Sequence, residues 1–190
     1  MKRKTGLLIA LIIIGSFVLA VCADIGIIFL GKQIYPLKYE NYVEKYAAEY
    51  NVPSSVVYGV IKVESDFDPD AVSSVGAIGL MQMLPDTFSW LSSSEHLDEN
   101  LPITSLYDPE TSIKYGVYYL KYLHEKFQNW DTTIAAYNGG EGNVAEWLEK
   151  PQYCDKDGNL NTKKIPFPET RNYSHKVSIA KNFYEHTYNK

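Results

Sequence analysis

The chain has 190 residues, which is enough for one domain plus a short extension and for a core that folds without disulfide bonds. Its formal net charge at pH 7 is −5 and it contains no block of basic residues, which argues against a nucleic-acid partner. The two cysteines provide no disulfide framework, because Cys22 falls within an apolar N-terminal run and is not expected to pair with Cys154. The four histidines are scattered without ligand spacing, so we expect no metal site and no cofactor.

The N-terminus combines a basic stretch at residues 2–4 with an apolar run at 6–23, which Asp24 interrupts and which resumes at 25–30. Such a segment is either a secretory signal peptide or a single membrane anchor. Because the run is long for a signal peptide and long enough to span a bilayer, we favour an uncleaved transmembrane signal-anchor, with its basic stub, at residues 1–32. The positive flank stays in the cytoplasm, so both interpretations place residues 33–190 outside.

Two helices are predicted after a short linker at 33–37. The first has one face marked by Tyr39, Tyr42, Val43, Tyr46 and Tyr50. Pro53 or Ser54 starts the second helix. Its apolar face follows the spacing i, i+3, i+4 and i+7 at Val57, Val60, Ile61 and Glu64. Pro69 disfavours a helical conformation of Asp68, so Glu64 is expected near the C-terminal end of a buried helix.

Glu64 occupies a position of this face where another Val or Leu would be expected. Partial burial and the negative end of the helix dipole both disfavour a charged carboxylate there. Both effects favour the protonated form, which a general acid must hold near neutral pH. The alternative is a Glu at a frayed helix end, turned to solvent.

The stretch from Ser65 to Gln82 is rich in turn-forming residues, and Gly76 and Gly79 permit tight backbone geometry. We expect a small irregular β-like excursion there, at the floor of a groove. Pro85-Asp86 then opens a short helix that reaches Trp90, and the polar residues 92–105 form a loop.

The remaining chain reads as further helices. Asp108-Pro109-Glu110 is a strong helix start, with a capping Asp, Pro at the first helical position and an acid in the first turn. Asp131 is predicted to cap the next helix, which ends at Gly139-Gly140, and residues 141–149 form a short helix. A loop at 151–168 leads to a last helix, whose buried face comprises Tyr173, Val177, Ala180 and Tyr184. The fold is therefore expected to be nearly all helical.

Several short motifs follow one another in a fixed order. They are Glu64-Ser65, Ala71-Val72-Ser73, Gly76-x-x-Gly79-Leu80-Met81-Gln82, Ala136-Tyr137-Asn138-Gly139-Gly140 and Pro168-Glu169-Thr170-Arg171-Asn172-Tyr173. With this order and spacing the chain resembles the catalytic domain of the lytic transglycosylases, lysozyme-like enzymes that cleave bacterial peptidoglycan. The resemblance covers residues from about 50 onward. It implies a lysozyme-like α-helical catalytic domain, which we expect at residues 33–190, after the transmembrane helix expected from the apolar run.

The resemblance also implies a reaction. Glu64 would be the single acid and base, protonating the glycosidic oxygen between N-acetylmuramic acid (MurNAc) and N-acetylglucosamine (GlcNAc). It would then take a proton from the muramic C6 hydroxyl, which closes a 1,6-anhydro ring. Most glycosidases pair two carboxylates, with substrate-assisted families as exceptions. The alternatives are a hydrolytic muramidase on the same fold and a non-catalytic cell-wall-binding protein.

The same resemblance assigns substrate-binding roles in the groove to Ser73, Gln82, Tyr137, Asn138 and Glu169. Tyr137 would hydrogen-bond Glu64 and hold it in place, and Glu169 would be a supporting hydrogen-bonding residue. Each has an ordinary structural alternative: a turn Ser, a helix-start Gln, a core Tyr, a helix-ending Asn and a first-turn acid.

Two further carboxylates, Asp66 and Asp68, are interpreted as solvated turn acids beside Pro69. The order of Met83 and Leu84 is reversed relative to the family, which leaves an apolar groove floor. The expected partners are peptidoglycan glycan strands and, through the N-terminal helix, a bacterial cell membrane crossed once. The catalytic domain would be extracytoplasmic, or secreted if the segment is cleaved; protein partners are unknown.

Overall fold

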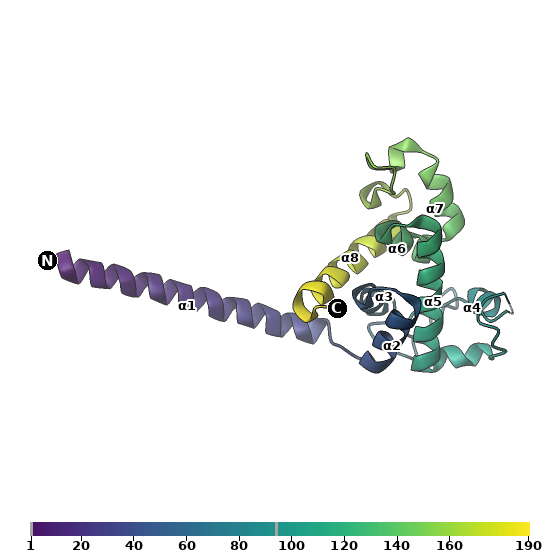
Figure 1. Cartoon of the computed structure of the whole chain (residues 1–190), viewed down its shortest axis with the longest axis horizontal. Coiled ribbons are helices and arrows are strands. Elements are labelled where there is room, and N and C mark those ends of the chain that lie inside the picture. The colour runs from purple at the N-terminus through teal and green to yellow at the C-terminus, as the bar shows by residue number, and fades with distance from the viewer. Residues whose placement is uncertain (1, 94) are drawn as a thin grey trace. The chain divides into compact units, whose positions relative to one another are not determined.

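The computed structural model describes the backbone of residues 2–93 and 95–190, with side chains for residues 14–23, 25–93 and 95–190 (Figure 1). It divides the chain into two units, Met1–Pro36 and Leu37–Lys190. The two units are described separately.

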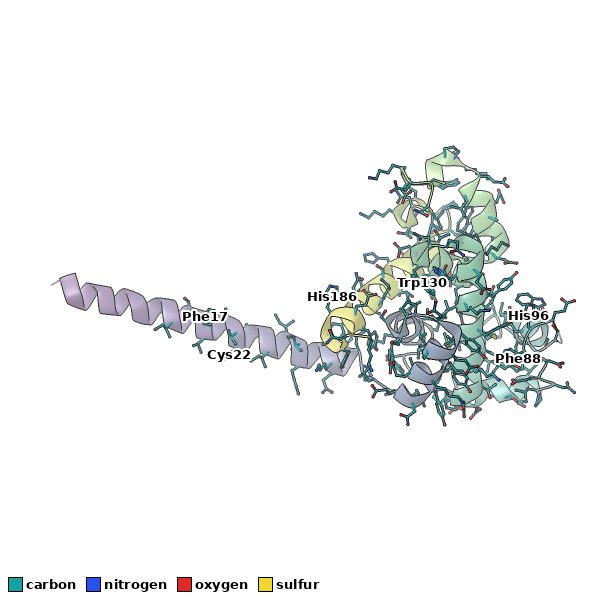
Figure 2. The ribbon with its side chains drawn as sticks, in the orientation of Figure 1. Phe17, Cys22, Phe88, His96, Trp130 and His186 are labelled. Carbon is teal, nitrogen blue, oxygen red and sulfur yellow. The ribbon has the colours of Figure 1, made fainter. Side chains whose placement is uncertain are left out.

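The first unit is one long helix, α1 (Lys2–Ile34). Its stretch Ile14–Ile34 is long and apolar enough to cross a membrane, and none of its described side chains is buried. Figure 2 shows Phe17 and Cys22 projecting from it, and 69% of the Phe17 side chain is exposed. The side chains at positions 2–4 and 24, on which the predicted orientation depends, lie outside the described residues.

The second unit is built from helices that pack around α3 (Ser54–Glu64) and α5 (Pro109–Phe127). The helix α3 packs most extensively against α8 (Pro168–Tyr188) and also touches α2 (Glu40–Tyr50). The helix α5 contacts α2, α4 (Pro85–Leu91) and α6 (Trp130–Gly139), and α6 in turn packs on α7 (Glu141–Leu148) and α8. In Figure 1, α5 runs between α3 and α4.

The apolar faces predicted from the sequence are the buried ones. On α3, Val57, Val60 and Ile61 are fully buried, and on α8 so are Val177 and Tyr184. The rings of Tyr58 and Tyr184 stack with centroids 4.9 Å apart, which joins α3 to α8. The prediction of a mainly helical fold is confirmed.

The helix starts are confirmed in one case and corrected in another. The carboxylate of Asp108 accepts a 2.9 Å hydrogen bond from the backbone N–H of Thr111, as expected of the cap of α5. The prediction that Asp131 caps α6 is wrong, because Asn129 is the cap: its side-chain oxygen accepts from the N–H of Thr132 at 3.0 Å. Asp131 lies inside the first turn. Tyr39 likewise precedes α2 and is not part of it.

The two predicted loops contain short 3₁₀ turns. Ile103–Tyr107 forms one before α5, and Pro151–Tyr153 and Thr162–Lys164 form two between α7 and α8. Position 94 of the first predicted loop lies outside the described residues. A β-bridge between Cys154 and Leu160 closes the second loop, and both cysteines are free thiols.

Candidate active site

A cavity of about 340 Å³ opens where the C-terminal end of α3 meets the first turn of α8 and the end of α6. All six side chains selected from the sequence line it: Glu64, Ser73, Gln82, Tyr137, Asn138 and Glu169. Seven further residues complete the lining: Val75, Ala77, Met83, Leu84, Thr87, Tyr119 and Gly140. The wall therefore combines one apolar side with a small number of polar groups, as is usual for ligand sites.

Glu64 is the last residue of α3. The chain leaves the helix sharply, because Asp66 and Phe67 both adopt left-handed backbone conformations with φ of 52° and 64°. The hydroxyl of Ser65 donates a 2.8 Å hydrogen bond to the carbonyl oxygen of Leu80, which ties the end of α3 to the segment below it. These contacts fix the position from which the Glu64 side chain enters the cavity.

Burial raises the pKa of Glu64 from 4.5 to about 7. Loss of solvation is the largest cause, because a carboxylate is stabilised by water more than its neutral form is. The charge of Glu169 raises this pKa further, and the nearby hydroxyl of Tyr173 lowers it. A substantial fraction of Glu64 is therefore protonated at neutral pH.

Tyr173 was expected only as a core residue of α8, yet its hydroxyl approaches Glu64 from that helix. The hydroxyl oxygen is buried and forms no hydrogen bond of ordinary geometry with the described residues. Burial also raises the pKa of Tyr173 well above 10, so it is a neutral donor. Its hydroxyl is therefore available as a donor to the carboxyl of Glu64.

Glu169 lies in the first turn of α8, one turn before Tyr173, and its side chain is exposed at the cavity. It is a second carboxylate facing the same space as Glu64. Glu169 is exposed and retains more of its hydration than the half-buried Glu64, so the two carboxyls are held in different environments.

The segment between α3 and α4 forms the predicted β-like excursion, with antiparallel bridges pairing Ile78 to both Val72 and Met83. Gly79, with φ of 79°, turns the chain where a Cβ would lie 2.1 Å from the carbonyl oxygen of Leu106. Within this excursion Ser73 is partly engaged, because its Oγ accepts a 3.0 Å hydrogen bond from the N–H of Ala77.

Gln82 also lies in the excursion and has a left-handed backbone with φ of 46°. Its Nε2 donates to the carbonyl oxygens of Ala71 and Gly79, at 2.9 and 3.0 Å. The amide nitrogen therefore holds the excursion together. The amide oxygen has no hydrogen bond to the described residues and remains free to accept one.

Tyr137 departs from its expected partner. Its hydroxyl donates a 2.8 Å hydrogen bond to the carbonyl oxygen of Met81, not to Glu64. The reason is geometric: Met81 is in the excursion beneath the groove, and its carbonyl accepts the bond that would otherwise leave a buried backbone oxygen unpaired. Asn138, the next residue, lines the cavity, and its side chain makes no hydrogen bond to the described residues.

Thr87 of α4 and Tyr119 of α5 line the cavity but were not selected from the sequence. Tyr119 packs against Tyr137 with ring centroids 5.4 Å apart. Neither Thr87 nor Tyr119 belongs to a motif or to an apolar face taken from the sequence. Met83 and Leu84 form the expected apolar floor.

Asp66 and Asp68 do not belong to this lining, in agreement with their interpretation as turn acids. Asp66 pairs with Lys62, and Asp68 accepts a 3.0 Å hydrogen bond from the N–H of Asp70. Among the residues that the structure describes, no cluster of three or more His, Cys, Asp or Glu side chains could hold a metal ion.

A helical domain with a half-buried Glu at the end of one helix, a short β-like excursion and a Tyr-Asn wall is the lysozyme-like arrangement predicted from the sequence. Residues 41–159 match the family described as the transglycosylase SLT domain. The chain belongs to this family of lytic transglycosylase catalytic domains within the lysozyme-like superfamily.

Individual relatives agree with this assignment. The soluble lytic murein transglycosylase of Escherichia coli K12 is 33% identical over 153 residues, which are 80% of this chain and 24% of that protein. The membrane-bound lytic murein transglycosylase C of Actinobacillus pleuropneumoniae is 32% identical over 175 residues, covering 82% of this chain and 47% of that protein. The chain therefore matches about a quarter to a half of these relatives.

Solved structures give the same result. A complex of the 70-kDa soluble lytic transglycosylase with bulgecin A superimposes with a TM-score of 0.77 at 31% identity, over 84% of this chain and 26% of that one. The lytic transglycosylase Slt of Pseudomonas aeruginosa, described as an inactive Glu-to-Gln mutant, gives 0.74 at 31% identity, over 82% and 25%.

Proposed function

We propose that this chain is a peptidoglycan lytic transglycosylase that cleaves the β-1,4 bond between MurNAc and GlcNAc and leaves a 1,6-anhydro-MurNAc end. The observation that carries the proposal is the buried carboxyl of Glu64, whose pKa of about 7 lies where an acid catalyst needs it. Family membership and the names of the relatives support the same activity.

In the proposed reaction Glu64 starts protonated and gives its proton to the glycosidic oxygen as the bond to C1 of MurNAc breaks. The N-acetyl oxygen of the same sugar stabilises C1 from the opposite face, so no second protein carboxylate is required. The Glu64 carboxylate then accepts the proton of the C6 hydroxyl, whose oxygen forms the new bond to C1. The proton returns to Glu64 and no water is consumed.

The other cavity residues would position the sugars. The free amide oxygen of Gln82 and the side chain of Asn138 are available to hydroxyl and acetamido groups. Tyr173 would donate to Glu64 once that residue is charged, because hydrogen bonds in catalytic sites often tighten only during the reaction. Ser73 and Tyr137 would support the excursion and the groove wall.

The test is mass spectrometry of the soluble fragments that the full chain releases from purified peptidoglycan. Anhydro-MurNAc ends from the unchanged protein, and none from Glu64→Gln, are the expected result. A folded wild-type protein that releases no fragments would contradict the proposal and favour a wall-binding role. Since one structural relative is a complex with bulgecin A, inhibition of release by bulgecin A is a second expected result.

A hydrolytic muramidase is the second candidate, and Glu169 is the observation that favours it. This carboxylate faces the same cavity as Glu64 and could activate water, as the second carboxylate of many glycosidases does. The same experiment separates the two candidates, because hydrolysis leaves reducing MurNAc ends in place of anhydro ends.

We also propose that residues 1–32 anchor residues 33–190 to a bacterial cell membrane, with the catalytic domain outside the cytoplasm. The exposed apolar side chains of α1 and the membrane-bound relatives support this arrangement. Recovery of the intact chain in membranes washed with alkaline carbonate is expected. A secreted protein whose first residue lies beyond the apolar run would show that the segment is a cleaved signal peptide.

A further inference from the structure

The lining of the cavity continues along two neighbouring helices. Thr87 of α4 lines the cavity, and Trp90 lies one turn further on the same face of that helix. Tyr119 of α5 also lines it, and Tyr122 again lies one turn further. Two i, i+3 pairs therefore lead away from the cavity lining, one along α4 and one along α5.

The second members of these pairs contact each other. The rings of Trp90 and Tyr122 meet edge to face with centroids 4.9 Å apart, and Trp90 and Tyr119 are 6.4 Å apart. Tyr119 and Tyr122 are nearly parallel, with an interplanar angle of 12° and centroids 6.3 Å apart. The three rings form a continuous aromatic surface that starts at the cavity wall, where Tyr119 also touches Tyr137.

Trp90 is the exposed ring of this surface, and Tyr119 and Tyr122 are half-buried beside it. Trp90 is 38% exposed, although a large aromatic ring is normally placed where it can bury its apolar area. His96 packs edge to face against Trp90, with ring centroids 4.3 Å apart. The Nδ1 of His96 lies 3.4 Å from the hydroxyl oxygen of Tyr118. In Figure 2, His96 lies on the α4 side of α5. His96 and Tyr122 therefore hold the exposed ring of Trp90 in place.

The chemistry of this surface suits a sugar ring. Pyranose rings present flat C–H faces that pack on aromatic rings, while their hydroxyl groups at the edge seek polar partners. Polar groups border the rings here: the carboxylate of Glu141 lies near the Tyr122 hydroxyl and pairs with Lys126 at 3.0 Å. Because Tyr119 belongs both to these rings and to the cavity lining, one occupant can contact both.

We propose that Trp90, Tyr119 and Tyr122 form an additional sugar-binding subsite, which holds the glycan strand beyond the sugars next to Glu64. The proposal rests on the proposed function, because it assigns the occupant as the same strand that the cavity would cleave. Trp90 is then a specificity-determining residue: it favours long strands over short ones and takes no part in the chemistry.

The test compares full-length Trp90→Ala, Trp90→Phe and Tyr107→Ala on a peptide-free glycan octasaccharide and on a tetrasaccharide. Tyr107 is a matched control, since it is also 38% exposed and does not line the cavity. We expect Trp90→Ala to lower kcat/KM on the octasaccharide about tenfold, mainly through KM, and to leave the tetrasaccharide nearly unchanged. Trp90→Phe should restore most of the loss, and Tyr107→Ala should have no effect.

An equal loss on both substrates, or an equal loss in Tyr107→Ala, would overturn the subsite. A binding measurement separates this outcome from failure of the proposed function. In a Glu64→Gln background, which cannot cleave, the affinity for the octasaccharide should still fall about tenfold when Trp90 becomes Ala. Unchanged affinity in that background would also overturn the subsite, whatever the catalytic result.

Discussion

The hydroxyl of Tyr173 approaches the carboxyl group of Glu64 from α8, and each of the two groups shifts the pKa of the other. The hydroxyl favours the charged form of Glu64, whereas Glu64 raises the pKa of Tyr173. Glu169, one turn earlier on α8, favours the neutral form of Glu64. The helix α8 therefore supplies both Tyr173, which lowers the pKa of Glu64, and Glu169, which raises it.

This arrangement predicts two opposite shifts in the pH profile of peptidoglycan cleavage. Wild-type kcat/KM should fall above pH about 7, where Glu64 loses its proton. Glu169→Gln removes a neighbouring negative charge, which lowers the pKa of Glu64, so this decline (the alkaline limb of the profile) should move to lower pH. Tyr173→Phe removes the hydroxyl that lowers this pKa, so the limb should move to higher pH. Tyr137→Phe is the matched control and should leave the limb in place, since its hydroxyl binds Met81. Shifts of the same sign in the first two variants would contradict the assignment.

The stability of the domain should depend on the same carboxyl group. The folded pKa of Glu64 is about 7 and its ordinary value is 4.5, so the folded state holds this proton more tightly than the unfolded state. The contribution of this proton to the free energy of unfolding is complete below pH 4.5 and is lost as the pH rises through 7. It amounts to about 3 kcal/mol at most.

Glu64→Gln should therefore melt at a higher temperature than the wild type at pH 8, with a difference that shrinks steadily toward pH 4.5. Thermal unfolding of both proteins across this pH range measures the effect. A constant difference at all pH values would show that Glu64 does not titrate as described.

Gly116 of α5 predicts a link between core packing and the groove. A Cβ at this position would lie 2.3 Å from the sulfur of Met81, the residue whose carbonyl accepts the Tyr137 hydroxyl. Gly116→Ala should therefore cost about 1–3 kcal/mol of stability and lower activity by displacing the excursion. Gly142→Ala is the control: nothing lies within 4 Å of its Cβ, so the substitution within α7 should stabilise the domain slightly. Equal effects in chemical denaturation would argue against the contact with Met81.

The start of α6 gives a simple test of which residue is the cap. Asn129→Ala removes the acceptor for the N–H of Thr132 and should destabilise the domain by about 1 kcal/mol. Asp131→Ala removes an exposed first-turn acid and should cost a few tenths of a kcal/mol. Urea unfolding of both variants distinguishes them, and the reverse order would restore Asp131 as the cap.

This cap illustrates how far the sequence alone could go. Asp108 was recognisable because Pro109 and Glu110 follow it, and each restricts the register of the helix start. Asn129 and Asp131 are both good capping types two residues apart, and only the backbone conformation shows that Asn129 is the non-helical one. Local chemistry therefore predicted the helix but not the residue at which it begins.

The same distinction applies to the site. Glu64 stood out because a carboxyl interrupted an apolar stripe, and burial supplies the predicted shift in its pKa. Thr87, Tyr119 and Tyr173 are brought to it by the packing of α4, α5 and α8, which no local pattern encodes. Tyr137 was placed on the correct wall, but its partner was not, because the carbonyl of Met81 competes for its hydroxyl.

The packing of α8 on α3 makes the acid conditional on tertiary structure. Without α8, Glu64 would be an ordinary hydrated carboxylate at the end of a helix, ionised at neutral pH and unable to donate a proton. A molecule in which α8 has detached would therefore carry Glu64 in its charged form, and would lack the proton that an acid catalyst must donate. Under the proposed function, cleavage of a covalent wall is thus expected only from chains whose last helix has docked.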